Sequence, residues 1–102
     1  MKYGLTDKEI DLIKNVFQKF PEVETVFIYG SRAKGNFKKT SDIDLALRFA
    51  KGAAGGIANI KSALDDLPLI HEINLLDESG ISSGSFKASY EKTRQIFYRN
   101  GQ

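Results

Sequence analysis

Residues 28–35 read IYGSRAKG and residues 41–45 read SDIDL, so ten residues separate a Gly-Ser pair from two aspartates. The Gly-Ser pair follows an apolar stretch, and a small-residue turn between a strand and a helix exposes backbone N–H groups that bind phosphate. Asp42 and Asp44 are two positions apart, so in a strand both carboxylates point to one face and reach one hard cation. Together these features predict a site for a nucleoside triphosphate and Mg²⁺.

Length and composition indicate one soluble domain spanning residues 1–102. The apolar content of 41% and the charged content of 27% are typical of a globular protein, although a core of this size is modest and association is plausible. The chain has no cysteine, which excludes disulfides and thiolate metal sites. No apolar run approaches 18 residues and the first residues lack a signal-peptide core, so we expect a cytoplasmic protein with no membrane partner.

Positive charge is concentrated around the Gly-Ser pair. Residues 30–52 contain six Lys or Arg and two Asp, a net charge of 6 − 2 = +4, which leaves −2 for the rest of a chain whose total is +2. One interpretation is a solvated lysine-rich loop, and the other is electrostatic attraction of a polyphosphate. These features disfavour nucleic-acid binding, because the whole chain is nearly neutral and this segment does not interleave aromatic with basic residues.

Hydrophobic periodicity and turn residues divide the chain into alternating helices and strands. A capping box at residues 6–9 starts the first helix, and Pro21 follows its end. The expected elements are a helix at 7–20, a strand at 23–29, a short helix at 31–35, a strand at 42–47, a small-residue loop at 51–56, a helix at 57–67, a strand at 69–76, a turn at 77–84 and a helix at 86–97. This order predicts a small α/β (α+β) fold in which helices back a mixed three-stranded sheet.

The spacing of Gly30 and Ser31 from the Asp-Ile-Asp stretch at 42–44 resembles the signature of the minimal nucleotidyltransferases of the DNA polymerase β superfamily. The resemblance continues through the expected third strand into the last helix. It implies that Gly30 and Ser31 hold the β- and γ-phosphates, and that Asp42 and Asp44 bind Mg²⁺. The metal would then align the α-phosphorus for in-line attack by an acceptor hydroxyl, with pyrophosphate leaving.

Several further residues have either a functional or a structural interpretation. Arg32 and Lys34 are candidates to contact phosphate, but Arg32 is equally well explained as a structural side chain folded against the sheet. His71 is the single histidine, and such a residue in a strand is more often packed than catalytic. Tyr90, Phe97 and Tyr98 are expected in the core or in an interface.

The family pattern carries a third acid on the third strand, where this chain has Asn74. An asparagine keeps a carbonyl oxygen for a cation but has no negative charge and accepts no proton. Loss of a general base at this position would cost roughly 10²–10⁴-fold in rate. Glu72, about 6–7 Å away along the strand, and Asp77 are possible substitutes, with Glu72 slightly favoured.

The resemblance also implies a partner. Family members of this length commonly accompany an all-helical protein, either a HEPN-type toxin or a four-helix substrate-binding bundle. The expected activity is transfer of AMP from ATP onto a hydroxyl of that partner, and one role that the resemblance implies is that of the antitoxin in a two-gene toxin–antitoxin pair. The alternative is a degenerate nucleotidyltransferase that serves as a partner-binding module because Asn74 replaces the third acid. An oligomer of the chain is also possible.

Overall fold

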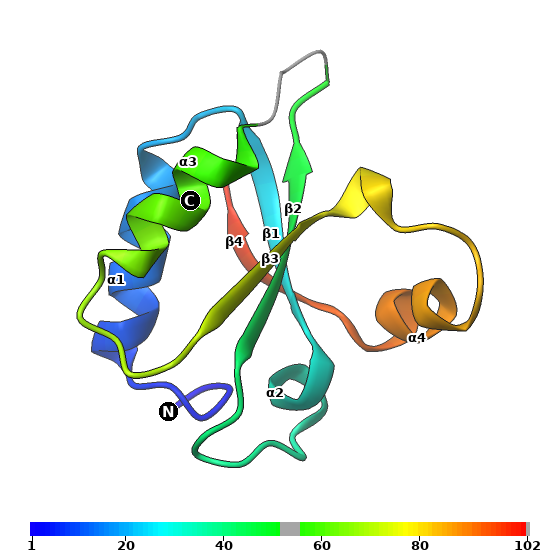
Figure 1. The fold of residues 1–102 in the computed structure, drawn as a ribbon, viewed down its shortest axis with the longest axis horizontal. Coiled ribbons are helices and arrows are strands. Elements are labelled where there is room, and N and C mark those ends of the chain that lie inside the picture. Colours follow the sequence, from blue (N-terminus) through cyan, green and yellow to red (C-terminus); the bar gives the residue numbers. More distant parts are fainter. Residues whose placement is uncertain (52–55, 102) are drawn as a thin grey trace.

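A single mixed sheet organises the protein in this computed structural model, which describes residues 1–51 and 56–101 (Figure 1). Its four strands lie in the order β3-β2-β1-β4. The strands are β1 (Val23–Tyr29), β2 (Ile43–Phe49), β3 (Ile73–Asp77) and β4 (Gln95–Arg99). β1 is antiparallel to both β2 and β4, whereas β2 and β3 are parallel. The parallel pair places the beginnings of β2 and β3 side by side.

Helices lie on both sides of this sheet. They are α1 (Asp7–Gln18), α2 (Gly30–Lys34), α3 (Ile57–Asp65) and α4 (Ser85–Thr93), with a short 3₁₀ turn η1 (Glu78–Gly80) after β3. In Figure 1, α1 and α3 lie together on one side, α4 lies on the other, and α2 follows the lower end of β1. The predicted capping box of Thr6 and Glu9 starts α1. Within the described ranges no helix combines the length and apolar character needed to cross a membrane.

The main core fills the space between the sheet and the pair α1 and α3. Along β2, Leu45 and Leu47 are fully buried in this core. Asp44 directly precedes Leu45, so by strand alternation its side chain belongs to the opposite face of the sheet. That face has a smaller buried cluster of Phe27, Ala46 and Tyr90, the last of which comes from α4. The aspartate-bearing face is therefore covered by much less protein than the α1 and α3 face.

The sequence prediction placed most elements correctly but was wrong about the C-terminal region. The sheet has four strands instead of three, because residues 95–99 form β4 and not the end of a helix. The apolar spacing of residues 86–97 continued at a helical period, but α4 ends at Thr93 and Arg94 is extended. Phe97 and Tyr98 are buried, as expected for core residues, but they are buried from a strand that pairs with β1.

Two smaller differences concern loops. The third strand begins at Ile73 instead of residue 69, and Ile70 in the preceding segment is 92% exposed. Of the loop expected at 51–56, residues 52–55 lie outside the described residues.

Candidate active site

Two carboxylates and one amide converge at the beginnings of β2 and β3. The parallel register pairs Asp44 directly with Asn74. The Asn74 side-chain nitrogen Nδ2 donates to Asp42 Oδ2 at 3.2 Å and to Asp44 Oδ1 at 3.0 Å. One oxygen of each carboxylate therefore points to the same position, which is occupied by the NH₂ group of Asn74.

This convergence fits a hard divalent cation. Mg²⁺ is typically held by one or two carboxylates together with water and substrate phosphate oxygens. Asp42 and Asp44 supply two such ligands, whose oxygens already share one donor. In the part of the chain that the structure describes, no group of three His, Cys, Asp or Glu side chains could enclose a metal. The residues thus fit a cation that would take its remaining ligands from water or from a phosphate.

Neither candidate substitute for the third acid points into this pair. The Glu72 carboxylate accepts from Lys61 Nζ of α3 at 3.3 Å. The Asp77 carboxylate caps η1, where it accepts from the backbone N–H and the hydroxyl of Ser79 at 2.9 and 2.7 Å. Both acids are therefore engaged elsewhere, and Asn74 alone occupies the position of the third acid.

Gly30 lies directly beside the Asp44 carboxylate, and Ser31 follows it in α2. The antiparallel register places Tyr29 opposite Asp44, and Gly30 follows as the first residue of α2. Gly30 has φ +75°, and a Cβ added there would collide with Asp44 Oδ2. The backbone conformation therefore favours glycine, and a larger residue would also have to displace the Asp44 carboxylate. Gly35, with φ +87°, ends α2 one turn later.

Arg32 is a structural side chain in this conformation. Only 2% of it is exposed. Its Nη1 donates to the Tyr3 carbonyl at 2.8 Å, and its Nη2 and Nε donate to the Ser41 carbonyl at 2.8 and 3.1 Å. Burial lowers the pKa of its guanidinium, and the carboxylates of Glu9, Asp42 and Asp44 oppose this shift. Of the two interpretations of Arg32, these contacts support the structural one, because Arg32 fixes the loop that leads into Asp42.

His71 connects the Arg32 guanidinium to α1. Its Nδ1 lies 3.3 Å from Arg32 Nη2, and its Nε2 lies 3.6 Å from the Glu9 carboxylate of α1. Its side chain is 9% exposed. The histidine is therefore packed between α1 and the Arg32 guanidinium, which agrees with the prediction of a packed residue.

A cavity of about 260 Å³ opens beside the Gly-Ser turn and Asp44. Residues of β1, α2 and β2 form one wall and α4 forms the other. The lining residues are Tyr29, Gly30, Lys34, Asp44, Phe86, Ser89, Tyr90 and Thr93. Burial and the nearby Asp44 charge raise the pKa of Tyr29 to about 12, so its phenol stays protonated. Lys34 is exposed at the rim of this cavity, unlike Arg32.

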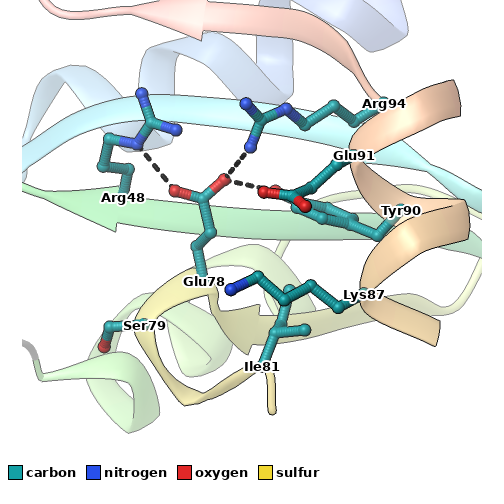
Figure 2. Close-up of a pocket in the computed structure, with 8 residues that line it drawn as sticks. All are labelled: Arg48, Glu78, Ser79, Ile81, Lys87, Tyr90, Glu91 and Arg94. Carbon is teal, nitrogen blue, oxygen red and sulfur yellow. Dashed lines mark hydrogen bonds and ion pairs between the residues drawn. The ribbon is translucent and has the colours of Figure 1, made fainter. Parts of the chain in front are cut away.

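A second polar cluster on the same face of the sheet holds α4 in place (Figure 2). The Glu78 carboxylate accepts from Arg48 Nε at 2.6 Å, from the Tyr90 hydroxyl at 2.8 Å and from Arg94 Nη1 at 2.5 Å. Burial raises the pKa of Glu78, but hydrogen bonds from Arg48 and Tyr90 and the two arginine charges outweigh it, and the pKa is lowered. The cluster thereby joins β2, η1 and α4.

Sequence reasoning missed this cluster. Its one local signal is that Arg48 shares the β2 face of Asp44 by strand alternation. Both arginines also lie over the Phe27 ring, with guanidinium carbons 4.7 Å (Arg48) and 4.4 Å (Arg94) from its centroid. The second wall of the cavity is therefore fixed to the sheet by charge as well as by apolar packing.

Comparison with known proteins identifies the family. The family model described as polymerase beta, nucleotidyltransferase matches residues 11–102. A protein of Haemophilus influenzae named probable protein adenylyltransferase MntA is 32% identical over 75 residues. That match covers 72% of this chain, but the chain spans only 65% of that relative's length. The chain belongs to the polymerase β nucleotidyltransferase family.

Solved structures share the fold. A crystal structure of a proposed nucleotidyltransferase from Sulfolobus solfataricus is 24% identical with a TM-score of 0.57, and the match covers 89% of this chain and 77% of that one. A toxin–antitoxin structure with AMP-PNP is 19% identical with a TM-score of 0.61, covering 90% and 74%. A mutant of the toxin–antitoxin pair MntA-HpeT is 20% identical with a TM-score of 0.58, covering 95% and 75%.

Proposed function

We propose that the chain binds a nucleoside triphosphate with Mg²⁺ and transfers the nucleoside monophosphate, AMP from ATP, onto a hydroxyl of a partner protein. The observation that carries this proposal is the convergence of Asp42 Oδ2 and Asp44 Oδ1 on one point beside the Gly-Ser turn. Family membership supports the reaction class. The name of the Haemophilus relative, a probable protein adenylyltransferase, supports AMP as the transferred group and a protein as the acceptor.

Each residue has a defined task in this proposal. Asp42 and Asp44 hold the cation, which neutralises phosphate charge and polarises the reacting phosphate when bound. The Gly30 backbone lies against the β- and γ-phosphates, and the Ser31 N–H and hydroxyl donate to them. Lys34, exposed at the cavity rim, attracts the triphosphate and takes the role that Arg32 cannot fill while it binds backbone carbonyls. Catalysis of this kind consists mainly of positioning and charge stabilisation.

The cavity beside Asp44 accommodates the nucleoside. Its far wall carries Phe86 and Tyr90, whose rings stack with centroids 6.4 Å apart. Phe86 is 52% exposed, so an aromatic face is available to a base or ribose. Aromatic stacking accepts any base, and the preference for adenine therefore rests on the relative's name.

The acceptor belongs to a partner of this chain. The names of two structural neighbours describe toxin–antitoxin assemblies, which supports a role as the antitoxin of a pair. We propose an all-helical partner, either a HEPN-type toxin or a four-helix substrate-binding bundle. It would dock on the sheet face that holds Asp44. Among the described residues, this face carries only the smaller buried cluster. We propose that the pair works in the cytoplasm, where ATP is available.

A second candidate function is a partner-binding module with slow or no transfer. Asn74 favours it, because the amide cannot accept a proton from an acceptor hydroxyl. Glu72 and Asp77 are bound to Lys61 and Ser79 and do not replace the missing acid. In this case nucleotide and Mg²⁺ still bind, but transfer is roughly 10²–10⁴-fold slower than with a general base.

A labelling experiment separates these functions. The purified chain is incubated with α-labelled ATP and Mg²⁺ in a lysate of its own host, in parallel with Asp44→Asn and with Asp66→Asn. Asp66 is an exposed acid at the end of α3, on the other side of the sheet, and serves as the matched control. Protein labelling by the wild type and by Asp66→Asn, but not by Asp44→Asn, is the expected result.

Asn74→Asp distinguishes the two functions further. Labelling that appears only with Asn74→Asp would assign the wild type to the binding module. Labelling that is equal in the wild type and Asp44→Asn would refute the site. Absence of labelling from every variant would refute the transferase.

A further inference from the structure

We propose that Asn74 acts as a built-in substitute for a cation. In the metal-free protein its amide holds Asp42 and Asp44 in the metal-binding arrangement, and Mg²⁺ consequently enters together with the triphosphate. This inference rests on the proposed function, because it concerns the same site. It assigns Asn74 a positioning role and explains how two acids alone remain organised without a third.

The hydrogen bonds of Asn74 have the geometry that this role requires. Its NH₂ group has two hydrogens, and the nitrogen lies 3.2 Å from Asp42 Oδ2 and 3.0 Å from Asp44 Oδ1. Two carboxylates that face one point repel each other unless a donor or a cation lies between them. The direct pairing of Asp44 with Asn74 in the parallel register keeps that donor in place.

The Gly-Ser turn limits the position of the Asp44 carboxylate on the side away from Asn74. Its Oδ2 lies where a side chain on Gly30 would be, so this carboxylate is enclosed between the Gly-Ser turn and Asn74. Because Asp42 and Asp44 both accept from one nitrogen, the pair is already arranged for a cation before any cation binds. A third carboxylate at position 74 would instead bring three negative charges to the same point.

Metal binding at this site has a specific cost. A cation must displace the NH₂ group, and the amide must turn by half a revolution to offer its oxygen instead. The protein contributes two negative charges to the cation and not three, and the affinity of oxygen sites for cations falls with ligand charge. A free divalent cation should therefore bind weakly, whereas a triphosphate brings the missing charge and oxygen ligands.

Metal binding and metal-free stability test this role without measuring transfer. Mn²⁺ is the probe, and unbound Mn²⁺ is measured by electron paramagnetic resonance for the wild type, Asn74→Asp and Asn74→Leu. Thermal unfolding of the same proteins is recorded with and without Mn²⁺. Asn59→Asp is the matched control, because it adds the same charge at an exposed position on α3.

The expected results differ for each variant. The wild type binds free Mn²⁺ only above about 1 mM, and binds one Mn²⁺ per chain tightly when a non-hydrolysable ATP analogue is present. Asn74→Asp binds free Mn²⁺ at least about tenfold more tightly, unfolds at a lower temperature without metal, and regains its stability with Mn²⁺. Asn74→Leu also loses metal-free stability but regains none, and Asn59→Asp behaves like the wild type.

Two results would overturn the proposal. The first is that the wild type binds free Mn²⁺ as tightly as Asn74→Asp does. The second is that neither substitution lowers the metal-free unfolding temperature. Failure of every protein to bind the nucleotide analogue would refute the proposed function instead, while the metal-free comparison of unfolding temperatures would still decide the role of Asn74.

Discussion

Replacing Arg32 with methionine should destabilise the protein severely, because Arg32 is a buried structural residue. Methionine retains most of the length of the side chain but none of its donors. The Tyr3 and Ser41 carbonyls, bonded at 2.8 Å each, would lose their charged partner. Hydrogen bonds to charged groups contribute roughly 1.5–3 kcal/mol each, so the two shortest predict a loss of about 3–6 kcal/mol. For a domain of this size that lowers Tm by at least about 12 °C.

The assay compares urea and thermal unfolding of the wild type, Arg32→Met and Lys34→Met. Lys34 is the matched control, because it is exposed two residues away on α2, and its substitution should change stability by less than about 0.5 kcal/mol. Arg32→Lys should recover only part of the loss, since a lysine cannot bond both carbonyls as the planar guanidinium does. An Arg32→Met protein that keeps wild-type stability but no longer binds nucleotide would refute the structural role. It would favour the alternative interpretation, in which Arg32 contacts phosphate.

Three further substitutions test other parts of the site. Gly30→Ala should cost about 1–3 kcal/mol in stability and abolish nucleotide binding, because its φ is +75° and the Asp44 carboxylate occupies the space. Gly80→Ala, at a glycine with open space around it, should change neither, and equal effects of both substitutions in unfolding and binding measurements would contradict this. Glu78→Gln should lower stability at pH 7 by about 1–3 kcal/mol. Because the pKa of Glu78 is lowered in the folded protein, its contribution to the free energy of unfolding is full above about pH 4.5 and is lost as the pH falls through the folded pKa. The stabilities of the variant and the wild type should therefore converge on acidification. A constant difference in stability down to about pH 3 would argue against the ion cluster. Phe86→Ala should weaken nucleotide binding in a titration with little change in Tm, because this ring is 52% exposed, and unchanged affinity would remove α4 from the nucleoside site.

Local patterns in the sequence predicted much of this fold because their causes are local. The capping box set the start of α1, and the alternation along 42–47 placed Asp44 on the face opposite the core. β4 was missed because its pairing with β1 joins residues about 70 positions apart, and the apolar spacing before it continued at a helical period. A strand at the edge of a sheet is decided by such a non-local partner as much as by its own residues.

The candidate site shows the same difference between features with local causes, which the sequence predicted, and features with non-local causes, which it did not. The motif alone singled out Asp42, Asp44 and the departure at Asn74 as candidates. It did not reveal that the Asn74 amide would face both acids, since this depends on the register between β2 and β3. Nor did it decide the role of Arg32, whose main-chain partner Tyr3 lies 29 residues earlier in the chain.

The central claim is that Asp42 and Asp44 bind a Mg²⁺–triphosphate beside the Gly-Ser turn. Isothermal titration with Mg²⁺ and an ATP analogue whose α,β-bridge is methylene tests it directly, because binding is measured without transfer. The account predicts saturable binding at one site per chain that requires Mg²⁺, is lost in Asp42→Asn and Asp44→Asn, and persists in the Asp66→Asn control. Binding that is unchanged in both site variants, or that does not depend on Mg²⁺, would contradict it.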